Sequence, residues 1–230
     1  MSGCPAIDQF EAAVESHLGY WRVDDGMGSS VAYDSSGRGN EGALHGVDAS
    51  KRVGRWPFAR GARARARRLG AGAVLPIDLE SAVGAEGWGT ALSRQTGAGN
   101  NQHYHIALHS EAQPSLFLIT VDGYALIRPA ETVPMGVWTH LAGVYDGAVA
   151  RLYVNGVEAG SQPLTGRFGA DTTPVILGGN GNDDTGVPTE LFPGRIDELM
   201  LYARALSATE IGQLAAGALF SAGSRDAGSD

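Results

Sequence analysis

Three histidines close together in the sequence are the first residues that could do chemistry. His103, His105 and His109 alternate with apolar residues and would share one face of a strand. A His-x-His pair can place two imidazoles on one zinc ion. At about 3.3 Å per residue, however, His109 would lie roughly 20 Å from His103 and could not complete such a site. The pattern therefore indicates histidines that face solvent or line a groove.

The paired carboxylates and activated nucleophiles of hydrolases have little support. Asp24–Asp25 and Asp183–Asp184 are adjacent pairs whose side chains would diverge in an extended chain. No Gly-x-Ser-x-Gly motif occurs, and Cys4 has no histidine nearer than His17. Gly37–Gly42 matches Gly-x-Gly-x-x-Gly but lacks the strand and helix that a dinucleotide loop needs. We therefore expect that the protein is not an enzyme.

Composition indicates a scaffold rich in strands and turns. Glycine makes up 34 of 230 residues, against about 7% in average proteins, which favours tight turns. The formal charge of −8 argues against the basic face that nucleic-acid binding requires. The single cysteine cannot form an intrachain disulfide, and no apolar run approaches the ~20 residues of a transmembrane helix.

Alternating hydrophobicity predicts a single all-β domain, a two-sheet antiparallel sandwich over residues 15–217. At least seven strands are expected, near residues 20–23, 103–109, 116–121, 137–145, 150–154, 157–162, 174–177 and 195–202. Asn155-Gly156 predicts a hairpin, because both residues tolerate positive φ. Short helices are predicted over residues 5–19 and from Ser207, where Ser207 and Glu210 would form a capping box.

Both ends of the chain are predicted to lie outside this domain. Residues 1–14 form an N-terminal segment, and residues 218–230, rich in Ser, Gly and Asp, are expected to be disordered. Cys4 follows Ser2-Gly3, which resembles the end of a bacterial lipobox, whose cysteine is lipidated after signal cleavage. Two interpretations stay open, a lipid anchor at Cys4 and an ordinary cysteine near a frayed terminus.

Four segments together carry a family resemblance. They are Gly19–Gly26 with Asp34–Asn40, Trp138–Gly147, Arg151–Gly156, and Gly194–Glu198 with Tyr202–Ser207. In order and spacing they resemble the laminin-G-like, concanavalin-A-like lectin/glucanase domains of bacterial surface and secreted proteins. The resemblance implies a jelly roll at the cell surface or in the extracellular space. The Glu-x-Asp-x-x-Glu pattern with which the glucanase relatives cleave sugars is absent from this sequence.

The resemblance also implies a binding function. Sugar sites combine exposed aromatic rings with planar polar side chains, and the candidates here are Trp88, Asn100, Asn101, Gln102, His103 and His105. The leading hypothesis is a non-catalytic surface module that binds a glycan or a surface glycoprotein. The alternatives are an adhesive domain that makes only protein contacts and a polysaccharide-active enzyme with an atypical site.

Relatives often hold a structural calcium where an Asp-Ser-Ser-Gly-x-Gly-Asn loop approaches an Ile-Asp-Glu strand. By this resemblance Asp34, Asn40 and Asp197, together with Asp25, are candidate ligands, since calcium prefers oxygen donors. The alternative is that Asp34 makes only an Asx-turn and that Asp197 caps a turn or strand.

Residues 55–85 depart from the family pattern. Five arginines occur within the nine residues from Arg60 to Arg68, where relatives have apolar core positions. Because arginine is rarely buried without a partner, an exposed edge, a disordered loop or a sequence anomaly is expected here. A patch for an anionic polymer is the functional alternative.

Overall fold

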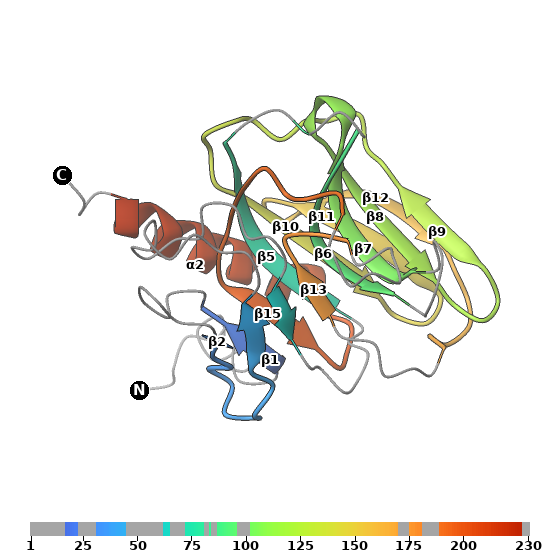
Figure 1. The fold of residues 1–230 in the computed structure, drawn as a ribbon. Helices are drawn as coiled ribbons and strands as arrows, with labels where there is room; N and C mark the ends of the chain where they lie inside the picture. Colours follow the sequence, from blue (N-terminus) through green and yellow to red (C-terminus); the bar gives the residue numbers. More distant parts are fainter. Residues whose placement is uncertain are drawn as a thin grey trace, which may run out of the picture.

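Two antiparallel sheets form the described part of the chain in this computed structural model (Figure 1). The structure describes residues 17–22, 31–44, 62–64, 72–80, 83, 87–95, 102–169, 175–180 and 189–226. The predicted N-terminal helix over residues 5–19 lies mostly outside these ranges. Its last predicted residues belong instead to strand β1, His17–Trp21.

The seven-stranded sheet has the order β1-β15-β5-β10-β11-β12, and β14 also pairs with β5. Its further strands are β5 Gly72–Leu79, β10 Thr139–Tyr145, β11 Val149–Val154, β12 Val157–Pro163, β14 Gly194–Ile196 and β15 Leu199–Tyr202. The β11–β12 hairpin turns at Asn155 and Gly156, with φ of 49° and 82°. The hairpin predicted from the sequence is thus confirmed.

The eight-stranded sheet has the order β2-β3-β4-β13-β6-β7-β8-β9. Its strands are β2 Val31–Ala32, β3 Gly42–Leu44, β4 Ala62–Ala64, β6 Trp88–Gln95, β7 Gln102–His109, β8 Gln113–Ile119, β9 Tyr124–Ile127 and β13 Val175–Leu177. The edges of the two sheets meet where the Leu126 N–H of β9 donates to Gln162 Oε1 of β12, at 3.0 Å.

A continuous apolar core fills the space between the sheets. Leu75, Leu141 and Leu152 reach it from the seven-stranded sheet, and Ile106 and Leu116 from the other, all essentially inaccessible to solvent. Alternation along each strand directs every second side chain into this layer. The two-sheet antiparallel sandwich predicted from the sequence is confirmed.

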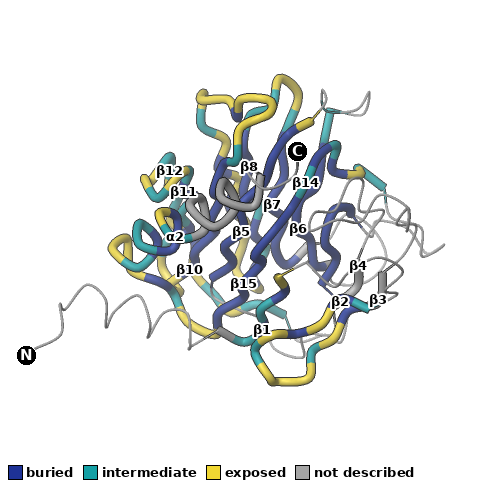
Figure 2. The backbone as a smooth tube through the Cα atoms, turned by 90° about the vertical axis from the view of Figure 1, so that its left-hand side faces the viewer, coloured by how far each residue is buried: buried dark blue, intermediate teal, exposed yellow. Residues whose placement is uncertain are grey.

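Helix α2 (Ala208–Asp226) covers the outer face of the seven-stranded sheet, and a short 3-10 helix, η2 (Ser110–Ala112), connects β7 to β8. Ile211 and Leu214 of α2 pack on Val74, Tyr153 and Met200 in a second apolar cluster. Figure 2 shows the helix in front of the buried strands of this sheet. In the described part of the chain no helix covers the eight-stranded sheet. Its outer face, the open face, is exposed along β9, whereas Ser93 of β6 and His105 of β7 are buried on it.

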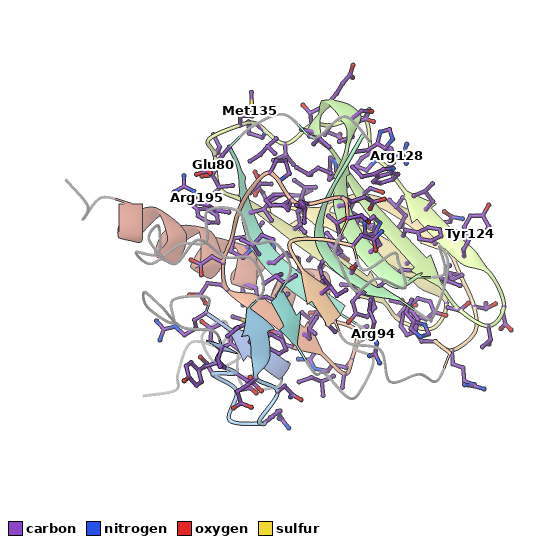
Figure 3. All side chains as sticks on the ribbon, in the orientation of Figure 1. Glu80, Arg94, Tyr124, Arg128, Met135 and Arg195 are labelled. Carbon is purple, nitrogen blue, oxygen red and sulfur yellow. The ribbon has the colours of Figure 1, made fainter. Side chains whose placement is uncertain are left out.

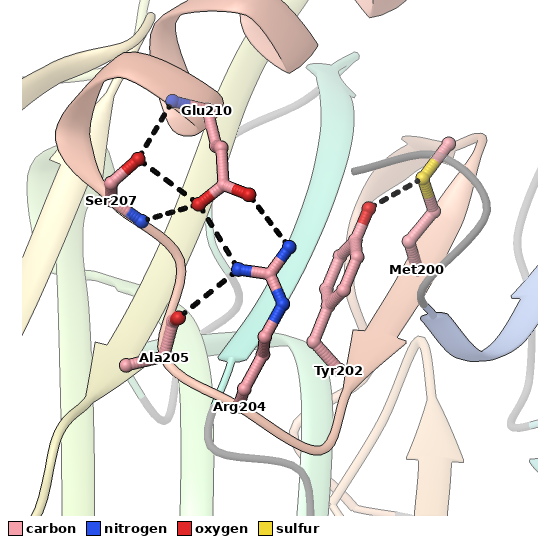
Figure 4. Close-up of polar contacts among 6 residues, drawn as sticks. All are labelled: Met200, Tyr202, Arg204, Ala205, Ser207 and Glu210. Carbon is pink, nitrogen blue, oxygen red and sulfur yellow. Dashed lines mark hydrogen bonds and ion pairs between the residues drawn. The ribbon is translucent and has the colours of Figure 1, made fainter. Parts of the chain in front are cut away.

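The start of α2 is fixed by the predicted capping box (Figure 4). Ser207 N donates to Glu210 Oε2 at 2.8 Å, and Glu210 N donates to Ser207 Oγ at 3.2 Å. Arg204 adds two hydrogen bonds to the Glu210 carboxylate, at 2.6 and 3.0 Å. The helix extends to Asp226, so the end predicted at Gly217 is too early.

The arginine-rich region differs from expectation. Its strand β4, with Arg63, lies between β3 and β13, so the expectation of an exposed edge is wrong for Ala62–Ala64. The next strand, β5, is buried along its whole length at the centre of the other sheet, where no strand is predicted. Pro76 lies within β5 and cannot donate to the ladder, which argues against a central strand when only the sequence is known.

Alternation also fails between β14 and β15. One continuous strand over residues 195–202 would place Ile196 and Met200 on the same face. Glu198 has φ of 47° and interrupts the strand, so Ile196 enters the core between the sheets whereas Met200 packs under α2.

Candidate functional site

Strands β6 to β9 direct a set of polar and aromatic side chains onto the open face. Cross-strand pairing forms one row from Ser93, His105, Phe117 and Leu126. In β9 Tyr124 is 64% and Leu126 42% exposed, whereas the alternate residues of that strand are buried. The rings of Phe117 and Tyr124 lie 5.9 Å apart. The β9 side of this face is therefore apolar and open to solvent.

Trp88 and Arg128 contact each other at one end of this face, since Trp88 begins β6 and Arg128 directly follows β9. The Arg128 Cζ atom lies 5.0 Å from the centroid of the Trp88 ring, in a cation–π contact. Between their strands lie the paired residues Ala107 and Ser115, which are completely buried. Figure 3 labels Arg128 and Tyr124 on the β9 side. Small residues on the central strands thus let two long side chains meet above them.

His109 braces the tryptophan from the neighbouring strand. Its ring packs edge-on against Trp88 at 4.6 Å, and its Nδ1 hydrogen-bonds the Ser110 hydroxyl at 2.8 Å. Partial burial and then the positive charge of Arg128 lower the pKa of His109. The indole is therefore held in one orientation while its surface remains partly exposed.

A buried hydrogen-bonded network lies beside Trp88. Thr90 Oγ1 is 2.7 Å from His105 Nε2 and 3.0 Å from Glu190 Oε2, which also accepts from Asn180 Nδ2 at 2.9 Å. Thr90 has one hydroxyl proton to donate. If Thr90 donates this proton to Glu190, its oxygen must accept from His105, so the His105 Nε2–H is the donor in that bond. The network ties the segment around Glu190 to the sheet.

His105 is neutral at physiological pH. Burial lowers its pKa to about 4, because the charged imidazolium loses its hydration. The Glu190 carboxylate, 3.6 Å away, acts in the opposite direction. His103 and His105 are only 2% and 4% exposed, so of the two predicted settings, facing solvent or lining a groove, the first is wrong for both.

Of the predicted ligand residues, Trp88 and His105 lie together, with ring centroids 5.6 Å apart, whereas Gln102 lies far from them. Trp88 begins β6 and Gln102 begins β7, and the two strands form a hairpin. Eight residues of strand place these ends about 23 Å apart. Asn100 and Asn101 lie outside the described residues, as do Cys4 and Asp25.

His103 belongs to the far end of the hairpin. Its ring contacts Phe168 at 6.0 Å, and Phe168 lines an open cleft of about 380 Å³ with Tyr145, Asp146 and Arg167. Asp146 is already paired there, since a hydrogen bond from Arg151 lowers the pKa of its carboxyl to about 2. The cleft is a second surface to consider.

Arg128, Phe117 and Tyr124 lie on the open face but were not predicted from the sequence. A signal existed for two of them: Tyr124-Ala-Leu-Ile-Arg128 alternates with period two and follows a turn at Asp122-Gly123. The partnership of Arg128 with Trp88 has no local signal, because two strands separate them.

Two of the predicted calcium ligands, Asp34 and Asn40, make hydrogen bonds that hold their loop together. Asp34 Oδ1 accepts the N–H groups of Tyr20 and Ser36, at 3.0 and 2.9 Å, and its Oδ2 accepts that of Asn40 at 3.0 Å. Burial alone would raise the pKa of Asp34. Hydrogen bonds to the Ser36 side chain and to the backbone outweigh this and lower the pKa below its usual value. The Asn40 side chain donates to Leu18 O.

Asp197 Oδ1 accepts the following N–H at 2.9 Å. No group of three or more His, Cys, Asp or Glu within the described ranges could hold a metal ion. Asp34 and Asn40 direct polar atoms toward protein groups, and the calcium site stays a prediction.

A charged cluster on the seven-stranded sheet is internally paired. Arg195 bridges Asp78 at 2.6 Å and Glu80 at 2.8 Å and stacks over Trp138 at 5.8 Å. Figure 3 labels Glu80 and Arg195 together, away from Tyr124. Because both carboxylates bind the same guanidinium, the cluster provides no free acid and base.

Residues 82–212 match the family described as the concanavalin A-like lectin/glucanases superfamily. The chain belongs to this superfamily. The family predicted from the sequence is thereby confirmed. A search of the curated proteins found no match. Of the helices that the structure describes, none combines the length and hydrophobicity needed to cross a membrane.

Solved members of similar fold include sugar-bound and toxin domains. Domain 4 of AbnA, a GH43 extracellular arabinanase from Geobacillus stearothermophilus solved with arabinotriose, is 22% identical, with a TM-score of 0.63, covering 87% of this chain and 98% of that one. The binding domain of botulinum neurotoxin serotype D is 12% identical, with a TM-score of 0.66, covering 91% of this chain and 52% of that one. At these identities the likeness concerns the fold.

Proposed function

We propose that this protein is a non-catalytic, extracellular carbohydrate-binding module, and that it binds glycan on the open face of the eight-stranded sheet. The observation that carries the proposal is the contrast between the two sheets. Helix α2 covers one outer face, whereas the other presents the half-buried rings of Trp88 on β6 and Phe117 on β8 and the exposed Tyr124 on β9. Exposed rings beside planar polar groups are what a sugar site requires.

The similar solved structures support the binding half of the proposal. The AbnA domain was solved with arabinotriose, and the enzyme that contains it is described as extracellular. The binding domains of botulinum neurotoxin serotype D and of Paraclostridial Mosquitocidal Protein 1 share the fold. Fold alone does not assign a ligand, so the side chains on the open face carry the argument.

The chemistry of the face supports binding without turnover. Glycosidases need two carboxyl groups flanking the scissile bond. Strands β6 to β9 contain no aspartate or glutamate. Glu190, beside them, already accepts hydrogen bonds from Thr90 and Asn180.

Isothermal titration with arabinotriose and a panel of plant and bacterial oligosaccharides tests the proposal. Tyr124→Ala and Trp88→Ala should each weaken binding at least tenfold, since a stacking ring supplies apolar contact that alanine cannot. Val157→Ala is the matched control, because Val157 is 70% exposed on β12 of the other sheet. Binding that survives both aromatic substitutions would contradict the proposed location.

A surface glycoprotein is the second kind of partner to test. The apolar β9 side of the open face, with Leu126 and Tyr124, also suits a protein surface. Enzymatic removal of glycans from a bound glycoprotein distinguishes the two cases. Loss of binding after deglycosylation supports the carbohydrate proposal, whereas retained binding favours the adhesive domain.

A further inference from the structure

Arg128 carries a positive charge that the described residues leave without a counterion. Its side chain is exposed and contacts the Trp88 ring, and the structure gives it no ion pair among the described residues. In contrast, Arg151, Arg195 and Arg204 each bind a carboxylate at 2.6 Å. The charge of Arg128 is therefore free for a ligand.

The guanidinium is held in position before any ligand arrives. The contact of the Arg128 Cζ atom with the Trp88 ring at 5.0 Å restricts the side chain, and His109 packs against Trp88 in turn. Buried Ala107 and Ser115 form a rigid floor between the two strands. Less side-chain entropy is then lost on binding than for a freely rotating arginine.

The strands of this face carry no carboxylate of their own. The whole chain has a net charge of −8, yet strands β6 to β9 contain no acidic residue, and the Glu190 carboxylate beside them already accepts hydrogen bonds from Thr90 and Asn180. His109 lies close enough for the charge of Arg128 to lower its pKa. An arriving anion would reverse that effect and favour a second positive charge.

We propose that the open face is selective for acidic saccharides, with a uronate carboxylate bound by the Arg128 guanidinium. A carboxylate matches the planar fork in a bidentate pair. The adjoining sugar rings lie toward Phe117 and Tyr124, along the side of the face where these aromatic rings are found. The inference rests on the proposed carbohydrate-binding function and specifies its ligand class.

Titration of the full chain with tetragalacturonate and, in parallel, with neutral arabinan and xylan tetrasaccharides tests this selectivity. The acidic probe should bind at least tenfold more tightly than the neutral ones. Arg128→Gln should remove this preference, and Arg128→Lys should restore only part of it, because an ammonium cannot form the bidentate pair. Raising NaCl from 20 to 300 mM should weaken the acidic complex of the unmodified protein but not that of R128Q.

Arg167→Gln is the matched control. Arg167 is likewise exposed but lies at the cleft near the other end of the β6–β7 hairpin. This variant should bind tetragalacturonate within twofold of the unmodified protein. Thermal unfolding of each variant verifies that it is folded.

The outcomes separate the two proposals. Equal binding of acidic and neutral probes with no effect of R128Q overturns the selectivity and leaves the carbohydrate-binding function standing. A loss of binding in R167Q instead of R128Q overturns both locations in favour of the cleft. No binding of any oligosaccharide overturns the function and the selectivity together.

Discussion

His140 makes the stability of this domain depend on pH. It lies on β10 and is completely buried, and neither ring nitrogen has a hydrogen-bond partner among the described residues. Burial lowers its pKa to about 4. The unfolded chain, whose histidines titrate near 6.5, therefore takes up a proton between pH 6.5 and 4 that the folded chain does not. Stability is full above pH 6.5 and falls as the pH decreases through this window.

The size of the effect follows from the shift. For each buried histidine the free energy of unfolding falls by about 1.4 kcal/mol per pH unit below 6.5. Lowering the pH to 5 therefore removes ~2 kcal/mol of unfolding free energy through His140. His105, whose pKa is also about 4, adds a similar amount. Asp146 and Glu210, with pKa values of about 2, lose their contributions only as pH falls below about 4.5. The histidines therefore dominate between pH 6.5 and 5.

Urea unfolding at pH 7.5 and pH 5.0 measures this difference. The unmodified protein should lose about 4 kcal/mol of unfolding free energy and His140→Leu only about 2 kcal/mol, because one of the two buried histidines is gone. His109→Gln, at a partly exposed position, should keep nearly the full loss. An unchanged pH dependence in H140L would refute the reasoning.

Three further changes test other parts of the structure. Glu190→Ala should lower the unfolding free energy by ~1–3 kcal/mol in urea, because Thr90 and Asn180 lose their acceptor; no loss would mean the network is not formed. Ser207→Ala should cost about 1 kcal/mol through the lost cap of α2, whereas a threonine there should cost little. Asp34→Asn should destabilise the protein in calcium and in EDTA alike if the carboxylate serves only its loop; a larger loss in calcium, by thermal unfolding, would support the predicted cation site.

Local patterns in the sequence were enough to identify most strands and the sandwich. Asn155-Gly156 and the box at Ser207 are signals carried by two to four residues, and both appear in the structure as predicted. Strand β5 escaped because Pro76 interrupts the expected donor pattern, although its carbonyl still accepts from Asp197 N at 3.2 Å.

The site could be predicted only in part, because its residues come together through sheet register. Trp88 was identified as a candidate ring, but its neighbours depend on pairing across four strands. Asn100, Asn101 and Gln102 were grouped with Trp88 because they are close in the sequence. In the β6–β7 hairpin, however, Trp88 lies opposite His109, and Gln102 lies at the other end. Register is set by many distant contacts at once, and a short motif does not contain it.

The contact between Leu126 and Gln162 also bears on the solubility of the module. An edge strand with free N–H groups is a template on which a second molecule can add its own strand and begin a fibre. Here a glutamine from the other sheet occupies one of these donors on β9, next to the most exposed apolar residues of the face. This hydrogen bond therefore makes the β9 edge a poorer template for strand addition beside the exposed Tyr124 and Leu126.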